Sequence, residues 1–231
     1  MHHLKKEIKF IEAATETKVH VKEILDENLT LRTIRNWIRT ENVQPQDVII
    51  FYYSGHGFRT KTNSTVWPSI YFPHKEEWLD MYQLIKEFSA KPASLYIIIA
   101  DCCNNFVKIK SPLNSCQFSK KNEMFKITQK TSSSYKKLLL ENYGLIIASG
   151  AIPGKISWAT DKGSIFTNAF IDNIHSELEK SEPQWERIFT RTMTSCRFAQ
   201  KPQFFLLLSP INEGLEFKPH EMNFQKLKNY K

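Results

Sequence analysis

Two apolar runs in the sequence each lead into side chains that are able to perform nucleophilic catalysis. Residues 48–53 are followed at once by a segment that contains His56, and residues 95–100 by a segment that contains Cys103. Each run has the length and composition of a fully buried β-strand. The histidine and the cysteine are therefore predicted to emerge at the ends of two core strands, where a thiol nucleophile and an imidazole base can meet.

Such a pair supports cleavage of a carbonyl compound through a covalent thioester. A thiol attacks as its thiolate, and an ordinary cysteine pKa of about 8.5 leaves little thiolate at neutral pH. A neighbouring imidazole takes the proton and later delivers it to the leaving amine. Backbone N–H groups must then stabilise the oxyanion, and Gly57 and Cys103 are candidate donors. Because a single cysteine or histidine is more often structural, only the combination points to a catalytic site.

The elements that must position these side chains alternate between strand and helix patterns. Helices are predicted where apolar residues recur every three to four positions, and strands where short apolar or alternating runs lie between turn residues. In chain order, the sequence predicts a helix at 4–17, a strand at 19–24, a helix capped by Thr30, a strand at 48–53, an irregular loop at 58–74, a helix at 76–88, strands at 95–100 and 144–149, a helix opened by Ser164, a helix at 185–193 and a last strand at 202–208.

This order of elements favours an α/β fold, in which a mostly parallel sheet carries helices on both of its faces. In such sheets, ligands bind beyond the carboxyl ends of the strands. His56 and Cys103 both follow their strands directly, so we expect them at that edge of the sheet.

Composition bounds the architecture and the class of partner. The chain has 231 residues, of which 41% are hydrophobic, and this suits one α/β domain or at most two small ones. The formal net charge of +8 raises the expectation of acidic partners. However, the excess is mostly lysine spread along the chain, without an arginine-rich stripe or a nucleic-acid motif, so we expect no nucleic-acid partner.

The cysteines and the N-terminus indicate the compartment. No two cysteines form a CxxC pair or a zinc spacing, which favours a reducing compartment and hence a cytoplasmic protein. The N-terminus lacks an apolar signal segment, and no run approaches the ~18 residues of a membrane span, so we expect no membrane association. The cysteines are at positions 102, 103, 116 and 196.

Two segments stand apart from the strand and helix patterns. Residues 106–143 are rich in lysine and poor in apolar residues, and we predict a mobile basic insert there. Residues 213–231 have the composition of a loose polar tail. The predicted domain therefore covers residues 1–212.

The two strand-end motifs have recognisable neighbours in the sequence. The segments concerned are Gln46–Phe58 with its YSGHG string, Ala100–Cys103, Gly163–Phe170 and Gln200–Phe204. Together they resemble the caspase–metacaspase superfamily of cysteine peptidases, above all metacaspases and their bacterial relatives. The separation of His56 and Cys103 is also close to the roughly 50 residues that are typical of caspases. Over residues 4–208, the resemblance implies a caspase-like three-layer α/β/α sandwich and a cysteine endopeptidase that acts on polypeptides.

The resemblance also implies roles for individual residues. His56 would be the general base, Gly57 an oxyanion donor and Cys103 the nucleophile, while Cys102 occupies a position that is usually serine. Ser54 and Asp101 match positions that line the primary specificity pocket of metacaspases, which implies cleavage after Arg or Lys. A strand-end cap is the alternative role for Asp101. Asp161 is a weaker candidate on a loop that borders the cleft, and the alternative is a solvated turn residue.

The sequence departs from the family pattern in three respects. Asn104-Asn105-Phe106 replaces the His-Ser-Gly that commonly follows the cysteine. The chain begins inside what resembles the family's first helix, so we expect the first strand of the sheet to be missing. Many metacaspases bind calcium through clustered aspartates, but no comparable cluster occurs here, and we predict no cofactor and no metal site.

Two other functions stay open at this stage. The departures are compatible with a catalytically inactive caspase-like domain that acts as an interaction module. The basic charge is compatible with nucleic-acid binding, which would weaken steeply with salt. By resemblance, residues 106–143 are also a candidate self-cleavage linker, and a solvated loop is the alternative. The sequence gives no indication of the oligomeric state.

Overall fold

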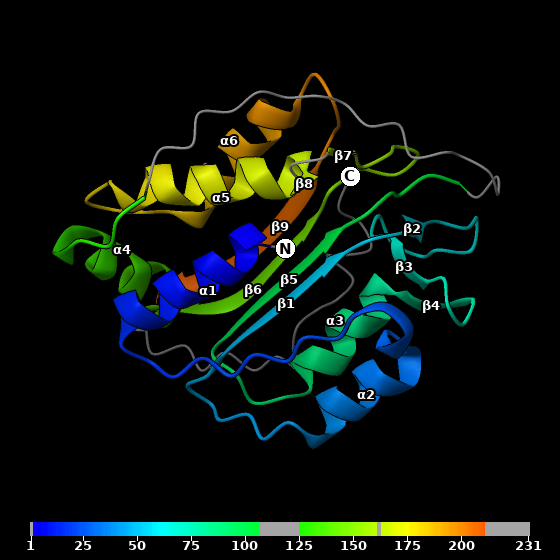
Figure 1. Cartoon of the computed structure of the whole chain (residues 1–231), viewed down its shortest axis with the longest axis horizontal. Coiled ribbons are helices and arrows are strands. Elements are labelled where there is room, and N and C mark those ends of the chain that lie inside the picture. Colours follow the sequence, from blue (N-terminus) through cyan, green and yellow to red (C-terminus); the bar gives the residue numbers. More distant parts are fainter. Residues whose placement is uncertain (1, 107–124, 161–162, 211–231) are drawn as a thin grey trace.

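A four-stranded sheet forms the centre of the protein (Figure 1). The computed structural model describes residues 2–106, 125–160 and 163–210. Strands β1, β5 and β6 run parallel, and β9 pairs antiparallel with β6. The spatial order is β1 (Val48–Ser54), β5 (Leu95–Asp101), β6 (Asn142–Ser149) and β9 (Gln203–Pro210). All four strands are confirmed predictions, as is the mostly parallel sheet.

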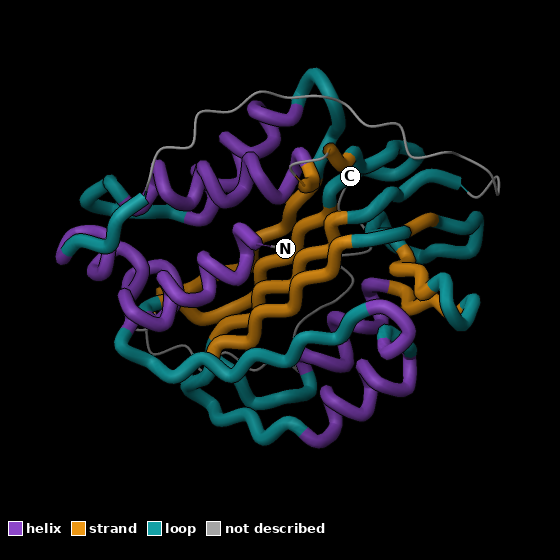
Figure 2. The backbone as a smooth tube through the Cα atoms, in the orientation of Figure 1, coloured by secondary structure: helices purple, strands orange, loops and turns teal. Residues whose placement is uncertain are grey.

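Helices cover both faces of this sheet, as the tube view shows (Figure 2). Two helices pack on one face, where they share a core with alternate residues of β1 and β5. Four helices pack on the other face around a second core. The first pair is α2 (Leu31–Thr40) and α3 (Met81–Ser89), and the second group is α1 (His2–Thr15), α4 (Gln129–Leu140), α5 (Ile165–Leu178) and α6 (Trp185–Cys196). The predicted three-layer α/β/α arrangement is confirmed.

The two strands that precede the histidine and cysteine motifs differ in burial. Every residue of β5 is buried, because strands flank it on both sides and helices cover both of its faces. By contrast, β1 lies at the edge of the sheet in the described part of the chain, and Ile50 is 44% exposed. The prediction of a fully buried strand is therefore right for β5 and wrong for β1.

The strand predicted at 19–24 is wrong. These residues adopt no regular structure, and the side chain of Val21 is 60% exposed. Alternating residue types form a strand only where a neighbouring strand accepts their backbone hydrogen bonds. Within the described chain, no strand pairs with this segment, which leads instead into a short 3₁₀ turn, Asp26–Asn28.

The loop predicted at 58–74 contains part of a small antiparallel sheet instead. This sheet has the order β2-β3-β4 and lies beside the carboxyl ends of β1 and β5 (Figure 1). Its last strand occupies residues that were predicted to begin the next helix. Helix α3 therefore starts at Met81, after the N-cap Asp80, and not at residue 76. The three strands are β2 (Gly57–Phe58), β3 (Ser69–Phe72) and β4 (Glu77–Asp80).

The predicted mobile insert at 106–143 is wrong for its second half. Helix α4 lies there, and its Tyr135, Leu138 and Leu139 are buried against the sheet and helix α1. A capping box between Thr128 and Thr131 starts the helix. Its lysines lie on the outer side of the helix. The high lysine content of this segment therefore hid its apolar face from the sequence-based prediction. Residues 107–124, like the tail at 213–231, lie outside the described residues.

Two further short strands, β7 (Ala159–Thr160) and β8 (Gly163–Ser164), form a hairpin before α5.

Thr30 caps helix α2 as predicted, because its side-chain oxygen accepts a 3.1 Å hydrogen bond from the Thr33 N–H. No helix in the described ranges is long and apolar enough to cross a membrane.

Candidate active site

The parallel pairing of β1 with β5 brings the histidine and cysteine motifs together. Ser54 and Asp101 are partners in this ladder, so His56 and Cys103 each lie two residues beyond an aligned pair. The Gly55 N–H also donates to the Asp101 carbonyl oxygen at 3.3 Å, which extends the pairing past the last strand residues. His56 is exposed and Cys103 is partly buried, so both side chains lie at the surface.

Gly57 shows how closely the two motifs pack. A Cβ atom placed on Gly57 would lie 2.3 Å from the Sγ of Cys102 and 2.7 Å from the carbonyl oxygen of Cys103. Both distances are shorter than any van der Waals contact, so only glycine allows this approach. The main chain that directly follows His56 therefore rests on the cysteine pair.

The backbone of His56 is held firmly, while its ring is left available. The His56 carbonyl oxygen accepts a 2.9 Å hydrogen bond from the Tyr71 N–H and lies 2.8 Å from the Tyr53 hydroxyl. The imidazole makes no hydrogen bond to any of the residues that the structure describes. A fixed backbone with an unengaged ring suits a group that must accept a proton only when substrate is present.

The orientation of β2 decides where the Gly57 N–H points. In a strand, successive N–H groups point to opposite sides, and the His56 carbonyl and Gly57 N–H belong to one peptide. Because the His56 carbonyl faces β3, the Gly57 N–H faces away from β3. The Arg59 N–H, two residues on, donates at 2.9 Å to the Asn105 carbonyl, so this side faces the segment after Cys103. The Gly57 N–H thus faces the side on which the segment after Cys103 lies.

The structure separates the roles of the two adjacent cysteines. Cys102 is 1% exposed and belongs to the core beneath Gly57. Cys103 lies at the surface, and its thiol is 3.6 Å from the carbonyl oxygen of Ser157. Burial raises the pKa of the Cys103 thiol, and the charge of Asp101 raises it further. Cys103 therefore favours the protonated thiol, which could attack a carbonyl only with the help of a base.

Asp101 lies beneath the cysteine pair and is 3% exposed. The Ser157 hydroxyl donates to one of its carboxylate oxygens at 2.8 Å, and the Thr167 hydroxyl donates to the other. Thr167 in turn contacts the Tyr52 hydroxyl at 2.6 Å. No described lysine or arginine forms an ion pair with Asp101, and burial raises the pKa of its carboxyl group.

Asn104, the residue after Cys103, forms hydrogen bonds that connect three segments of the site. The fully buried Asn104 side chain donates to the carbonyl oxygens of Val66 at 2.8 Å and Ala151 at 3.1 Å. Its own oxygen accepts a 3.1 Å hydrogen bond from Arg59, which is buried as well. The Asn104 backbone pairs with Lys155 and Gly154 of the loop after β6. Asn104 thereby fixes the segment that carries Cys103.

A family model described as the caspase domain matches residues 1–209 of this sequence. The chain belongs to the caspase domain family. Caspase domains are a family of cysteine peptidases, so the fold is one in which a cysteine thiol can act on peptide bonds. A search among curated protein sequences gives no match.

Solved structures share this caspase-domain fold at low sequence identity. A protein from Geobacter sulfurreducens has a TM-score of 0.57 and 13% identity, with 88% of this chain and 81% of that chain covered. Caspase-1 from Spodoptera frugiperda has a TM-score of 0.52 and 16% identity, with 88% and 77% covered. At these identities, the likeness extends to the fold and not to individual residues.

The sequence-predicted site residues of the caspase domain have distinct locations. Gly57 and His56 lie on the β1 side and Cys103 on the β5 side of one site, with Asp101 buried below. Ser54 is exposed at the end of β1, opposite Asp101 in the ladder. Asp161 lies outside the described residues.

Four site residues were missed as functional candidates in the sequence. Arg59 and Ser157 carry no local signal, because nothing near them in the chain indicates that they become buried or half-buried beside the cysteines. Thr167 and Gln200 fall within two of the family-like segments, which is a weak signal. Gln200 donates to the Gly150 carbonyl at 2.8 Å and to the Ser157 hydroxyl at 3.2 Å, and so holds the loop that contacts Cys103.

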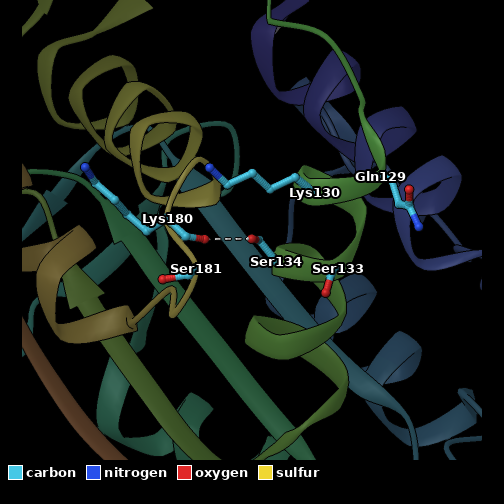
Figure 3. A pocket seen from close by; sticks show the side chains of 6 residues that line it. All are labelled: Gln129, Lys130, Ser133, Ser134, Lys180 and Ser181. Atoms are coloured by element: carbon cyan, nitrogen blue, oxygen red, sulfur yellow. Dashed lines mark hydrogen bonds between the residues drawn. The ribbon is translucent and has the colours of Figure 1, made fainter.

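A shallow cleft of about 330 Å³ lies at the opposite end of the sheet, between α4 and the turn after α5 (Figure 3). Two lysines and three serines contribute to its lining, and Ser134 donates to the Lys180 carbonyl at 3.2 Å. This cleft shares no residue with the candidate active site around His56 and Cys103. Among the described residues, no group of three or more metal-ligating side chains is present.

We expect alkylation of Cys103 to accelerate continuously as the pH rises from 7 to 9. Because burial raises the pKa of this thiol, its thiolate fraction at pH 7 is smaller than that of an ordinary cysteine, and it should grow about tenfold per pH unit. Iodoacetamide rates, followed by mass spectrometry of the peptide that contains Cys103, test this expectation. Cys103→Ser is the control, and a plateau that begins below pH 7 would contradict it.

Proposed function

We propose that the chain is a cysteine endopeptidase in which Cys103 is the nucleophile and His56 the general base. The observation that carries this proposal is the packing of Gly57 on Cys102 and Cys103, which leaves no space for a side chain. This contact holds the segment after His56 against the segment of Cys103. The surface position of Cys103 and the burial of Cys102 support the second cysteine as the nucleophile.

The proposed reaction proceeds through an acyl-enzyme. The Cys103 sulfur attacks the scissile carbonyl carbon while its proton passes to the His56 imidazole, and the N–H groups of Gly57 and Cys103 hold the oxyanion. The C–N bond then breaks, and the imidazolium returns the proton to the leaving amine. A water molecule, deprotonated by His56, hydrolyses the thioester and regenerates the thiol. Because the pKa of Cys103 is raised, this proton transfer must accompany the attack.

We also propose that the enzyme cleaves after Arg or Lys. Asp101 is a buried acid next to the nucleophile, and no described basic residue neutralises it. The hydroxyl groups of Ser157 and Thr167 donate to its two carboxylate oxygens, so it is hydrogen-bonded but has no positive partner among the described residues. A guanidinium or ammonium group of the substrate would supply the missing positive charge. Ser54, exposed above Asp101, would line the entrance.

We propose a reducing compartment, such as the cytoplasm, as the place of action. Cys102 and Cys103 both have free thiols. Catalysis through Cys103 requires that it remain reduced, and an oxidising compartment would favour disulfides or further oxidation of an accessible thiol.

Covalent labelling tests the proposed function directly. The purified protein is incubated with a peptide acyloxymethyl ketone that ends in Arg, and the adduct is located by mass spectrometry. We expect an adduct on Cys103, none with Cys103→Ala, and undiminished labelling with Cys102→Ser, which alters only the neighbouring thiol. Loss of labelling in His56→Ala would assign the base. No adduct in a folded wild-type sample, with or without calcium, would overturn the proposal.

A catalytically inactive interaction module is the second candidate function. The raised pKa of Cys103 and the absence of a hydrogen bond from the described His56 ring favour it, because neither feature activates the thiol at rest. The labelling experiment separates the two functions, since an inactive domain would fold normally and yet form no adduct on Cys103.

A further inference from the structure

The small sheet beside His56 carries aromatic rings on the face that points away from the core. Phe58, Tyr71 and Trp78 belong to this face, which we call the aromatic face. The opposite face of the same sheet carries side chains that are buried in the main core, namely Ile70, Phe72 and Leu79. Antiparallel sheets with one buried face usually present polar residues on the other, so the aromatic face needs an explanation.

The rings of the aromatic face pack edge to face as one surface. Tyr71 and Trp78 are direct cross-strand partners in β3 and β4. The ring centroid of Phe58 lies 6.0 Å from that of Tyr71 and 6.1 Å from that of Trp78, with interplanar angles of 72° and 66°. The outermost ring, that of Trp78, is 56% exposed. An exposed and already ordered aromatic cluster is typical of a binding surface.

This face is continuous with the proposed catalytic base. Phe58 follows His56 by only two positions and lies in β2. The backbone of Tyr71 binds the His56 carbonyl oxygen at 2.9 Å. A ligand that covers the aromatic face is therefore also positioned beside the His56 imidazole.

The mechanism defines which part of a substrate would pass there. His56 must protonate the amine that leaves, so the chain on the carboxyl side of the scissile bond departs past the imidazole. The residue whose side chain enters toward Asp101 lies on the other side of Cys103. The aromatic face begins in β2, directly after His56, and thus lies on the leaving-group side.

We propose that the aromatic face binds an apolar or aromatic side chain of the polypeptide substrate, just after the scissile bond. This inference rests on the proposed peptidase function and adds a second determinant of specificity to it. Phe58 and Tyr71 hold the indole of Trp78 in place, and Trp78 supplies most of the exposed contact area. Because the three rings are ordered before binding, little conformational entropy is lost when the substrate packs on them.

Two kinds of substrate isolate this contact. The first is a short peptide ending in Arg with a fluorogenic amide, which has no amino acid after the scissile bond. The second is an internally quenched peptide that has Phe or Ala after the Arg. For the wild type, we expect KM to be about tenfold lower with Phe than with Ala, the effect of one well-packed aromatic contact. Trp78→Ala should abolish this difference between the Phe and the Ala peptide.

Further variants and outcomes make the test decisive. Trp78→Phe should restore most of the preference for Phe, and Val21→Ala, which removes an exposed apolar side chain in the segment before α2, should change nothing. If the wild type cleaves neither substrate, the proposed function fails. If it cleaves both and Trp78→Ala keeps the same Phe-to-Ala ratio, the aromatic face is not a subsite. A wild-type dimer that Trp78→Ala dissociates would assign the face to self-association and overturn the inference.

Discussion

Replacing Asn104 with alanine is expected to lower the free energy of unfolding by about 3 kcal/mol and to reduce catalytic turnover at least tenfold. The side chain makes three hydrogen bonds in a fully buried position, and each is worth about 1 kcal/mol in net terms. The carbonyl oxygens of Val66 and Ala151 keep other donors, Gln203 and Ser149 respectively, so the loss is limited to the bonds themselves.

The loss of turnover follows from position rather than from contact with substrate. Asn104 connects the loop after β2, the loop after β6 and the segment of Cys103. When Asn104 is removed, Arg59 loses its one hydrogen bond to a described side chain. Small displacements of a nucleophile reduce kcat strongly, because the attacking atom must lie close to the carbonyl in a fixed direction. We therefore expect kcat to fall and KM to change little.

The neighbouring residue provides the matched control for this prediction. Asn105 has the same side chain and is partly buried, but its side chain makes no hydrogen bond to a described residue. Asn105→Ala should change the free energy of unfolding by less than about 0.5 kcal/mol. Urea denaturation measures both variants, and a common midpoint for Asn104→Ala and Asn105→Ala would rule out the role assigned to Asn104.

Asp101→Asn is expected to stabilise the fold at neutral pH while it removes the preference for basic substrates. Burial raises the pKa of this carboxyl group in the folded protein above its ordinary value. Such a group stabilises the fold fully below its ordinary pKa of about 4, and that contribution is lost as the pH rises through the folded value. Above the folded pKa, a buried carboxylate without a positive partner is therefore less favourable than a neutral amide.

The variant should accordingly melt about 2–4 °C higher than the wild type at pH 7, which corresponds to about 1 kcal/mol in a domain of this size. This difference should shrink as the pH falls through the raised pKa of the folded protein, because the wild-type carboxyl group then becomes neutral. With peptides that differ only in Arg or Gln before the scissile bond, the ratio of kcat/KM values should fall by about 10²-fold or more, because a buried charge pair is lost.

Thr167→Val separates the charge of Asp101 from its hydrogen bonds. This substitution keeps the shape of the side chain and the carboxylate, but it removes one hydroxyl that donates to Asp101. The variant should be less stable than the wild type and should retain the preference for Arg. If Asp101→Asn cleaves the Arg and Gln peptides in the wild-type ratio, Asp101 does not determine specificity.

The sequence predicted the central strands and the position of the two catalytic motifs because both depend on local patterns. In β5, seven consecutive residues are buried, and apolar composition alone reveals such a strand. The same reasoning failed at residues 19–24, where alternation exists but no neighbouring strand is described. It also failed for α4, where lysines and serines are interspersed with the apolar residues that form the buried face.

Part of the candidate site lay beyond local patterns as well. The small sheet β2-β3-β4 consists of strands of two to four residues, which are too short to stand out in the sequence. Arg59 is charged and would be expected in solvent, yet carbonyl oxygens of the following loop and Asn104 satisfy it in the interior. Such burial depends on partners that only the folded chain brings together.

The histidine and cysteine at two adjacent strand ends were determined by the sequence itself, since the apolar runs before them fix both strands and their parallel alignment. Tertiary structure decided which cysteine reaches the surface. Gly57 has no side chain, so its backbone packs directly on the thiol of Cys102 and covers it. Tertiary structure also decided that Asp101 lies under the site without a counter-charge and that three aromatic rings flank His56. These features arise from contacts between loops that are distant in the chain, and no local preference encodes them.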